Sequence, residues 1–543
     1  MTTADKSPLP PFVKAAKFFG PQPVFFTSRC QRRAYWAQDE RWVSGIIRAL
    51  SFRCDGVLPS QIALDPVDSA PHALEAGSLP ALKLDAGGKR HVNLRAVVAL
   101  AAPLFLNSGI QAVLNLTDTW FLGHISTDAI AAVGAVYWFV IVFVLLFGGV
   151  AMAVQTLVAQ AYGAGNRVRA ARVTWSGLWA VLLVSPLFVI VSLSGSHLIA
   201  PFKLAPNIET LALEFWFPRL LGAIGGVALW TVSSFFNGIG RTKVTLLIMV
   251  CVAVVNALLN DLFIFHLGMG VAGSGWATGA AQLVGVAIGM SVFLSRGVCS
   301  VFFAHRCWRP DWKEVRRAMA LGVPMGLLPA VDLIGTALFQ VMQVGLGSAS
   351  GAATQIVMMM TSLAYMPAIG IASSGTTLVG QSIGAGDKGW AVRVGNVAIA
   401  LTVAYMGLVS IALALAGPWL LPQFIVPSDP HGAETLALAY KLLWIAAAYQ
   451  IFDGCNLGAG FALRGAGDAR VPTLIVIVLS WFFFVPLVHA LSFAPGQGWV
   501  SFLPQFGFGT AGGWSALLVY TFSLATAMLL RWRSGAWRRI NLG

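Results

Sequence analysis

Long apolar segments recur along most of this chain, and they constrain its fold more than any other feature. They begin near residue 95, end near residue 531 and alternate with short polar breaks. A helix needs about 20 apolar residues to cross a bilayer, and the segments reach that length. A membrane β-barrel would instead show alternating segments of about ten residues, a pattern that the sequence lacks. We therefore predict an all-α integral membrane protein.

Twelve transmembrane helices are expected from the spacing of these segments. Only 10% of the 543 residues are charged, whereas soluble domains carry about 25%. One membrane domain therefore explains the length better than several soluble domains. The predicted spans are 95–122, 128–158, 170–198, 212–238, 244–266, 271–295, 315–345, 350–380, 391–420, 435–463, 471–494 and 510–531.

The chain outside the spans divides into an N-terminal extension, a linker and a tail. We place the extension at 1–93, an N-terminal six-helix lobe at 94–300, a cytoplasmic linker at 301–314, a C-terminal six-helix lobe at 315–531 and a basic cytoplasmic tail at 532–543. The extension is rich in Pro and lacks the apolar region and cleavage site of a signal peptide. We favour a mostly disordered cytoplasmic tail, or a start codon placed too early. The alternative is a surface-lying amphipathic helix around Trp42, Ile46, Ile47 and Leu50.

Basic residues are distributed unevenly among the loops. The formal net charge is +14, and clusters of Lys and Arg follow the even-numbered spans, as at Arg167, Lys388 and Arg533. Odd-numbered loops carry only scattered residues such as His124. By the positive-inside rule, both termini and all even-numbered loops face the cytoplasm, and the inner membrane is the expected location. The same distribution explains the positive charge without a nucleic-acid partner.

Sequence motifs for catalysis, resident metals and cofactors are missing. The six cysteines form no CxxC pair and the eight histidines no HExxH helix. No P-loop GxxxxGK[ST] is present, so direct coupling to ATP would need a partner chain. We therefore expect no cofactor and favour coupling to an ion gradient over an enzyme.

An internal repeat gives the strongest signal of organisation. The stretch from Pro103 to Gly165 aligns without a gap on the stretch from Pro324 to Gly386, at an offset of 221 residues (324 − 103). Identical pairs include Gly149/Gly370, the TLV triplets at 156–158 and 377–379, Gln160/Gln381 and the GAG triplets at 163–165 and 384–386. A weaker match at a different offset sets 236–240 beside 463–467. The repeating unit is six helices.

Six is an even number, so both halves begin on the same side of the membrane. Such parallel repeats are related by an axis along the membrane normal, and transporters built from them bind substrate near the midplane, between the repeats. We therefore look for function in polar residues inside the predicted spans.

Several short motifs resemble a known family of exporters. The run from Pro103 to Thr119, then Ala131-Ala132-Val133-Gly134, the sequence AQAYGAG at 159–165 and the sequence LRGAGD at 463–468 occur in this order. Together they resemble a multidrug and toxic compound extrusion (MATE) exporter, closest to the NorM-type branch, over about 440 residues. The resemblance implies a secondary antiporter that exports small organic, mostly cationic and amphipathic compounds in exchange for Na⁺ or H⁺.

Three carboxylates lie inside predicted spans at positions where the resemblance implies cation coupling. Asp118 lies in the first span, Asp332 lies eight residues after Pro324, and Asp453 lies ten residues before Leu463. An ionisable group in a bilayer is costly and marks function by default. A carboxylate there is stable when it is protonated or holds a cation. If the ion is Na⁺, Asp332 and Asp453 are its expected ligands; the alternative is that each Asp only bonds a neighbouring helix.

Two positions depart from the family pattern. NorM-type members carry a glutamate where this chain has Asp332, so the side chain is one methylene shorter and its ion preference is open. Asn260 stands where some members, notably DinF-type ones, place an aspartate, and the asparagine resembles the NorM-type choice at this position. Asp261 follows it, and either replaces the missing acid or is a solvated group at the end of the helix. We favour the solvated group.

Further polar residues are weaker candidates for lining a cation or substrate site. They are Gln340, Gln343, Gln355 and Tyr365. Glutamines in bundles often bond only across helices, so both roles stay open for them.

Other functions remain as alternatives. A lipid-linked oligosaccharide flippase would need a strongly cationic cleft, and Arg219 is the clearest basic residue within a span. A membrane-embedded enzyme would need a catalytic motif, and a channel would not need a tandem repeat with buried acids. We expect a transporter whose partners are small-molecule substrates and the lipid bilayer, functional as a monomer.

Overall fold

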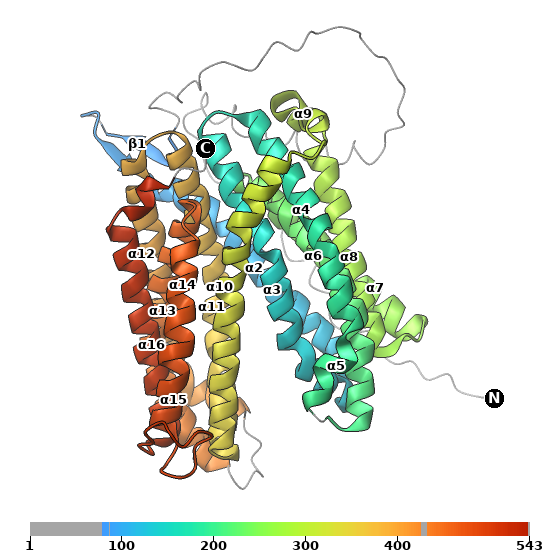
Figure 1. Cartoon of the computed structure of the whole chain (residues 1–543), viewed down its shortest axis with the longest axis vertical. Helices are drawn as coiled ribbons and strands as arrows, with labels where there is room; N and C mark the ends of the chain where they lie inside the picture. Colours follow the sequence, from blue (N-terminus) through green and yellow to red (C-terminus); the bar gives the residue numbers. More distant parts are fainter. Residues whose placement is uncertain (1–78, 86, 203, 425–431, 541–543) are drawn as a thin grey trace, which may run out of the picture. The chain divides into compact units, whose positions relative to one another are not determined.

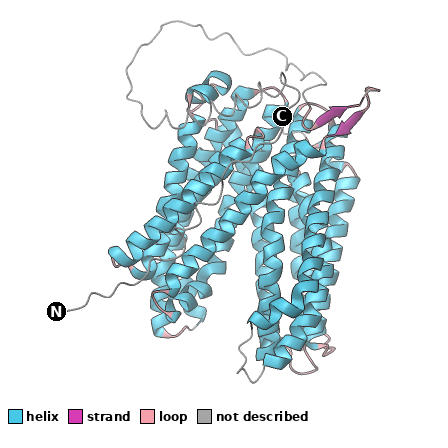
Figure 2. Cartoon of the chain, turned by 180° about the vertical axis from the view of Figure 1, so that it is seen from behind, coloured by secondary structure: helices cyan, strands magenta, loops and turns pink. Residues whose placement is uncertain are grey.

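The computed structural model describes residues 79–85, 87–202, 204–424 and 432–540. In this part of the chain, twelve helices are long and apolar enough to cross a membrane, and Figures 1 and 2 show that they dominate the structure. All of the described residues belong to one compact unit. The alternative of an amphipathic helix around Trp42 lies outside the described residues.

The N-terminal lobe contains six of these spans. They are α2 (Leu94–Gly123), α3 (Thr127–Gly163), α4 (Arg167–Leu193), α6 (Pro206–Gly238), α7 (Thr242–Asp261), which continues as the π-helix η4 (Leu262–His266), and α8 (Gly270–Phe293). The short helices α5 (Gly195–Ile199) and η3 (Ala200–Phe202) follow α4. The side chains of Asn93, Ser126 and Asn166 cap α2, α3 and α4 by accepting backbone hydrogen bonds, as polar residues at helix starts commonly do.

The C-terminal lobe contains the other six spans. They are α10 (Trp312–Gly345), α11 (Ser348–Gly384), α12 (Lys388–Leu420) with η6 (Leu421–Phe424), α13 (Gly432–Gly465), the continuous run of α14 (Arg470–Val478), η7 (Leu479–Phe484) and α15 (Val485–Ser492), and α16 (Gly509–Arg533). Asp311 caps the start of α10, and Asp387 caps the start of α12. The helix α9 (Arg296–Phe302) and the 3₁₀-helix η5 (Ala304–Arg306) lie between α8 and α10, where the predicted linker begins, and η8 (Ala536–Arg539) follows α16.

The twelve predicted spans are confirmed, with differences at their ends. The third span is predicted to reach residue 198, whereas α4 ends at Leu193 and α5 is a separate short helix. Pro186 lies within α4, and the helix continues past it to Leu193. This proline therefore does not explain why α4 ends there. The seventh helix begins at Trp312, three residues earlier than predicted, because Asp311 accepts hydrogen bonds from the backbone of Lys313 and Glu314.

A small hairpin precedes the bundle and corrects one prediction. The strands β1 (Leu82–Leu84) and β2 (Arg90–Val92) pair antiparallel, with Leu82 opposite Val92 and Leu84 opposite Arg90. Arg90 forms an ion pair with Asp387 at the start of α12, at 3.1 Å. The expectation of a disordered tail over 1–93 is therefore wrong for this stretch, which is too short and too polar to show a strand pattern.

Glycines of the repeat close the turns after α3 and α11. Gly165 has φ +73° and Gly386 has φ +83°, and the second repeat motif gives Gly240 at +80° and Gly467 at +81°. Residues with a side chain rarely adopt this left-handed conformation, whereas glycine adopts it freely. The GAG triplets therefore reverse the chain, and the equivalent glycines play the same part in both halves.

The lobes meet through reciprocal contacts between α3 and α11. A methyl group on Gly163 would lie 2.0 Å from the carbonyl oxygen of Gln381, and one on Gly384 would lie 2.0 Å from that of Gln160. The two contacts exchange repeat-equivalent residues, as expected of an interface on a two-fold axis. Glycine is required at both positions because the two helices approach within contact of their backbones.

Hydrogen bonds near the same helix ends repeat this reciprocity. The hydroxyl of Thr156 donates to the carbonyl of Arg464 at 3.0 Å, and the hydroxyl of Thr377 donates to the carbonyl of Asn237, also at 3.0 Å. Each bond joins one lobe to the other at matched positions of the repeat. These contacts are consistent with the predicted parallel repeat.

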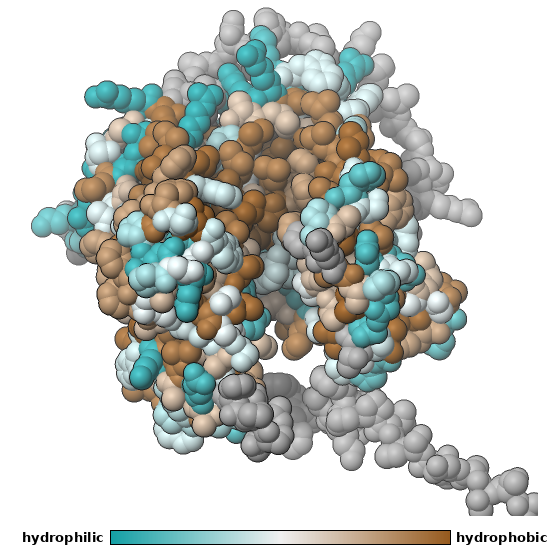
Figure 3. Space-filling view, turned by 60° about the horizontal axis from the view of Figure 1, so that its bottom comes forward, coloured by the Kyte–Doolittle hydropathy of each residue, from teal (hydrophilic) through white to brown (hydrophobic). Residues whose placement is uncertain are grey.

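Other helix pairs also cross between the lobes, among them α3 with α10 and α2 with α11. A methyl group on Gly149 would lie 2.2 Å from the carbonyl oxygen of Gly322, and one on Gly370 would lie 2.4 Å from that of Leu104. The close contacts are therefore on the C-terminal halves of α3 and α11. In Figure 3 the end of the molecule opposite these contacts is turned forward. This view shows a hollow with a largely hydrophobic surface between two groups of helices.

Replacing Gly384 by Ala tests whether this close approach holds the lobes together. The added methyl group has no space, so we expect a destabilisation of about 1–3 kcal/mol and a lower Tm in detergent. Gly134→Ala on α3 is the matched control, since nothing lies within 4 Å of its added methyl group, and it should leave the Tm unchanged or raise it. Equal Tm values for the two variants would contradict this packing.

Candidate functional site

Asp118 is the centre of a polar network inside the N-terminal lobe. Its Oδ1 accepts a hydrogen bond from Asn260 of α7 at 2.7 Å, and its Oδ2 accepts one from the hydroxyl of Thr278 of α8 at 3.2 Å. Asn256, one turn before Asn260, donates to the same hydroxyl at 3.3 Å. Three helices, α2, α7 and α8, thus contribute to one site.

Two oxygens in this network have no hydrogen-bond partner among the described residues. They are Oδ1 of Asn260, whose side chain is fully buried, and the hydroxyl oxygen of Ser274, a residue whose carbonyl accepts a hydrogen bond from Thr278 at 3.0 Å. Buried polar atoms are usually satisfied, so unpartnered ones call for an explanation such as an ion or water. Amide, hydroxyl and carboxylate oxygens are the ligands that hard cations prefer. The network has the composition of a site for a small cation.

The neighbouring acid, Asp261, lies outside this network. Its side chain is 55% exposed and its Oδ2 lies 3.4 Å from Nε2 of His266. This position agrees with the alternative in which Asp261 is a solvated group at the end of its helix, α7.

Asp332 lies inside the C-terminal lobe and is held by a tyrosine. Oδ1 of Asp332 on α10 accepts a hydrogen bond from the hydroxyl of Tyr520 on α16 at 2.6 Å. Short bonds to ionised groups are stronger than neutral ones. The Tyr520 ring stacks on Phe484, with 4.5 Å between ring centroids, so packing fixes the direction of its hydroxyl.

Asp453 of α13 is the second acid of this lobe. Its Oδ1 accepts a hydrogen bond from Asn456, three residues later on the same helix, at 3.2 Å. Asp453 and Asp332 are close enough to interact electrostatically, and Tyr365 of α11 interacts with both. The structure therefore brings two of the three predicted acids, and Tyr365, into one lobe.

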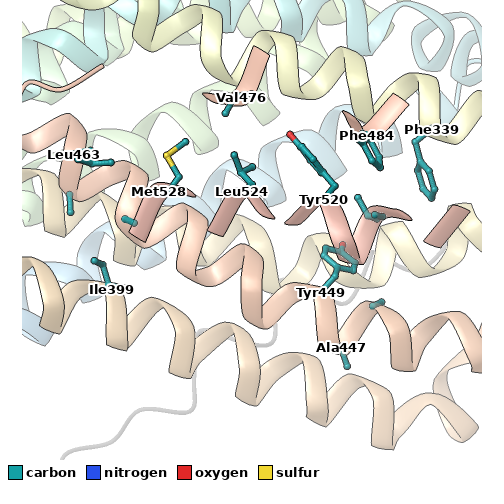
Figure 4. Close-up of a cluster of buried hydrophobic side chains, with 14 of the residues drawn as sticks. Phe339, Ile399, Ala447, Tyr449, Leu463, Val476, Phe484, Tyr520, Leu524 and Met528 are labelled. Atoms are coloured by element: carbon teal, nitrogen blue, oxygen red, sulfur yellow. The ribbon is translucent and has the colours of Figure 1, made fainter. Parts of the chain in front are cut away.

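Aromatic side chains pack together near Tyr520 in the C-terminal lobe. Figure 4 shows Tyr520, Phe484, Phe339 and Tyr449 in the buried cluster of the C-terminal lobe. Phe339 packs edge-on against Trp514 at 5.7 Å. These rings form one packed cluster, which includes Tyr520, the donor to Asp332.

The three candidate glutamines make their hydrogen bonds elsewhere. Gln340 bonds to Gln355, which is exposed. The buried Gln343 donates to the hydroxyl of Ser492 at 3.3 Å, and its Oε1 has no partner among the described residues. In the described chain, none of their hydrogen bonds reaches Asp332.

The three acids share one electrostatic property. Within the described residues, none of them forms an ion pair with Lys, Arg or His, although Arg219 of α6 is close enough to Asp118 to interact with it electrostatically. The same part of the chain contains no group of three or more His, Cys, Asp or Glu that would hold a metal ion. Each lobe therefore offers a carboxylate with polar neighbours but without a fixed counter-charge.

Sequence reasoning missed several members of these networks. Asn456 lies three residues from Asp453, a spacing that brings side chains together on a helix, so it was available from local sequence. Thr278 and Tyr520 lie more than 150 residues from the acids they contact, and no local pattern points to them.

A family model and named relatives match this chain. The model described as MatE matches residues 103–262 and 324–488, so its two matches begin at the prolines that open the two repeats. The "Multidrug resistance protein NorM" of Burkholderia vietnamiensis is 33% identical over 450 residues, covering 79% of this chain and 94% of the relative. The "Probable multidrug resistance protein NorM" of Bradyrhizobium diazoefficiens is 30% identical over 451 residues, covering 81% of this chain and 93% of the relative.

Solved structures show the same fold. A structure described as "Outward-facing conformation of a multidrug resistance MATE family transporter of the MOP superfamily" gives a TM-score of 0.72 at 18% identity, covering 82% of this chain and 96% of that chain. A MOP superfamily transporter from Pyrococcus furiosus gives a TM-score of 0.73 at 19% identity, covering 82% and 96%. Because the family model matches more than half of the sequence, in both lobes, the chain belongs to the MatE family of multidrug and toxic compound extrusion proteins.

Proposed function

We propose that this chain is a secondary active antiporter that exports small organic compounds, mostly cationic and amphipathic, in exchange for Na⁺ or H⁺. The observation that carries the proposal is the set of three carboxylates, Asp118, Asp332 and Asp453, which lie inside spans without an ion-pair partner in the described chain. The names of the NorM relatives support the export of drugs.

The exchange follows from competition for these carboxylates. A carboxylate in a medium of low dielectric is stable only when it is protonated or holds a cation. A proton or Na⁺ at such a carboxylate removes the negative charge that would attract an organic cation. Binding of the ion therefore favours release of the substrate, and the two species alternate.

Each lobe would bind the ion through its own oxygens. In the C-terminal lobe, Asp332 and Asp453 would share a cation, which also offsets the repulsion between them. In the N-terminal lobe, Asp118 and the unpartnered amide oxygen of Asn260 would contribute. Na⁺ is the cargo of this exchange and not a resident metal, and no cofactor or catalytic group takes part.

The lobes would expose the site to each side of the membrane in turn. Contacts across the lobe interface lie at the ends of α3 and α11 that lead into basic turns, followed by Arg167 and Lys388. By the positive-inside rule that end faces the cytoplasm, so the hollow of Figure 3 opens outward. We propose an inner-membrane location, cytoplasmic termini and a functional monomer.

Gradient-driven efflux of ethidium from proteoliposomes tests the proposal. An imposed Na⁺ or pH gradient should drive flux in the unmodified protein, and whichever gradient does so identifies the ion. Replacing Asp118, Asp332 and Asp453 together by Asn should reduce that flux to the level of protein-free liposomes, because the amide neither takes up a proton nor pairs with a cation.

Asp261→Asn is the matched control for this experiment. It makes the same chemical change on α7, but its side chain is exposed and lies beside His266, so flux should persist. Undiminished flux in the folded triple variant would contradict the proposal. A folded, unmodified protein that shows no flux under either gradient would favour the flippase alternative.

Tyr520→Phe tests whether the ion competes with a fixed donor at Asp332. The variant keeps the ring that stacks on Phe484 but loses the hydroxyl that donates to Asp332. A net hydrogen bond is worth about 0.5–1.5 kcal/mol, so the ion concentration for half-maximal flux should fall by roughly two- to tenfold. Tyr440→Phe, at a half-buried tyrosine of α13 whose hydroxyl donates to the carbonyl of Pro418, should not change it. A rise in the Tyr520→Phe variant would instead make the hydroxyl a ligand of the ion.

A further inference from the structure

A cationic pocket lies where the linker between the lobes meets α4 and the start of α10. Figure 1 shows α4 and α9 near this end of α10. The volume of the pocket is about 570 Å³, and its lining includes four cationic side chains, Arg172, Arg306, Arg309 and Lys313, with a single acid, Asp311. None of these residues belongs to the networks around the three membrane carboxylates.

The positive charge of this pocket is not balanced within the described chain. Oδ2 of Asp311 lies 3.7 Å from Arg172, while Oδ1 caps the first turn of α10. Arg306, Arg309 and Lys313 form no ion pair with a described carboxylate. Since Asp311 occupies the free amides of the helix start, the side chains are the groups left to bind an anion.

The thiol in the pocket does not supply the missing negative charge. Cys307 also lines the pocket. Burial raises the pKa of the Cys307 thiol above its usual value, and the neighbouring Arg172 offsets this only in part. The thiol is therefore neutral at neutral pH, and the pocket keeps its positive charge.

An apolar groove lies further along α10. A second cavity, of about 480 Å³, is lined by Met319, Ala320, Val323, Pro324 and Leu327, with Arg316 of α10 and Arg470 of α14. Positions 316, 319, 320, 323 and 327 share one face of a helix, because they are spaced by three or four residues. Trp312 and Arg316 extend this face to the pocket, so the cationic and apolar parts are adjacent.

The surroundings place this pair of cavities at the membrane surface. Trp308 and Trp312 are 52% and 65% exposed, and Val323 inside the groove is 51% exposed. Exposed tryptophans are typical of the interface between headgroups and hydrocarbon. The pocket is thus at the depth of lipid headgroups, and the groove begins at the depth of acyl chains.

We propose that these cavities bind one anionic phospholipid, with its phosphate in the cationic pocket and an acyl chain along the groove of α10. Basic pockets on the cytoplasmic side of membrane helices suit anionic headgroups. A soluble phosphate would use only the pocket and leave the apolar groove empty. Arg172 belongs to the N-terminal lobe and Lys313 to the C-terminal lobe, so one headgroup contacts both. The proposal requires only that the chain spans a membrane, and does not depend on antiport.

Native mass spectrometry of the purified full chain, titrated with lipids of matched acyl chains, tests this site. The protein should retain phosphatidylglycerol at least tenfold better than phosphatidylcholine, and inorganic phosphate should not displace the lipid. Replacing Arg306, Arg309 and Lys313 by Gln should abolish this preference. Ala320→Trp, which fills the groove without a change of charge, should weaken binding of both lipids.

Matched controls separate the site from general charge and surface effects. Arg167, Arg533 and Arg539 are exposed cations in other basic loops, and replacing these three by Gln removes the same charge and should keep the preference. Ala400→Trp is the control on the exposed face of α12. Equal retention of the two lipids, an equal loss in both triple variants, or displacement by inorganic phosphate would each overturn the proposal.

Discussion

The cost of an ionised carboxylate inside an apolar helical bundle is the constraint on which the rest of this structure depends. Lipid forces the backbone into helices, because each unpaired amide or carbonyl there costs several kcal/mol. The same medium penalises Asp118, Asp332 and Asp453 unless a proton, a cation or a strong donor offsets their charge. Each has polar neighbours and lacks a described basic partner. The sites are therefore suited to reversible binding of a small cation.

In the proposed mechanism, the lobe interface couples ion binding at the acids to movement of the lobes. Reciprocal contacts between Gly163 and Gln381, and between Gly384 and Gln160, leave no space for side chains. Tight packing of this kind exists in discrete arrangements and does not deform continuously. The acids lie within the lobes, on helices that also reach the interface, such as α10 with Asp332 and Gly322. A change in charge at the acid and a change in lobe contacts thus involve the same helix.

Most of the fold was predictable from the sequence. Bilayer thickness sets the length of the apolar spans, and the repeat shows as short motifs that recur at a constant offset. Twelve apolar spans and the GAG triplets indicated the helices and the turns between them. The hairpin at 82–92 was not predictable, since its strands are short and polar and its ion pair, Arg90 with Asp387, joins residues far apart in the sequence. The separate helix α5 likewise has no clear local signal.

The candidate site was predictable only in part. The acids are conspicuous because charge is rare within the spans, and Asp261 was expected at a solvated helix end. The donors to the acids were not predictable, because Thr278 and Tyr520 lie far from Asp118 and Asp332 in the sequence and meet them only in the folded protein. For the glutamines the sequence left two roles open, lining a site or bonding across helices. In the structure Gln343 bonds to Ser492 and Gln340 to Gln355. A polar residue within a span therefore indicates that a hydrogen bond forms there, but it does not identify the partner.

The central claim is that an ion at the carboxylates changes the relation of the two lobes. The most direct test is the distance between spin labels at His124 and Ser348, exposed residues beside α2 and α11 in opposite lobes, in a variant without native cysteines in nanodiscs. Loading with the coupling ion should shift the distance distribution toward shorter values, as the outward hollow closes. The variant with all three acids replaced by Asn should not respond to the ion. A distribution that neither Na⁺ nor pH moves, or an equal response in the variant, would contradict the account.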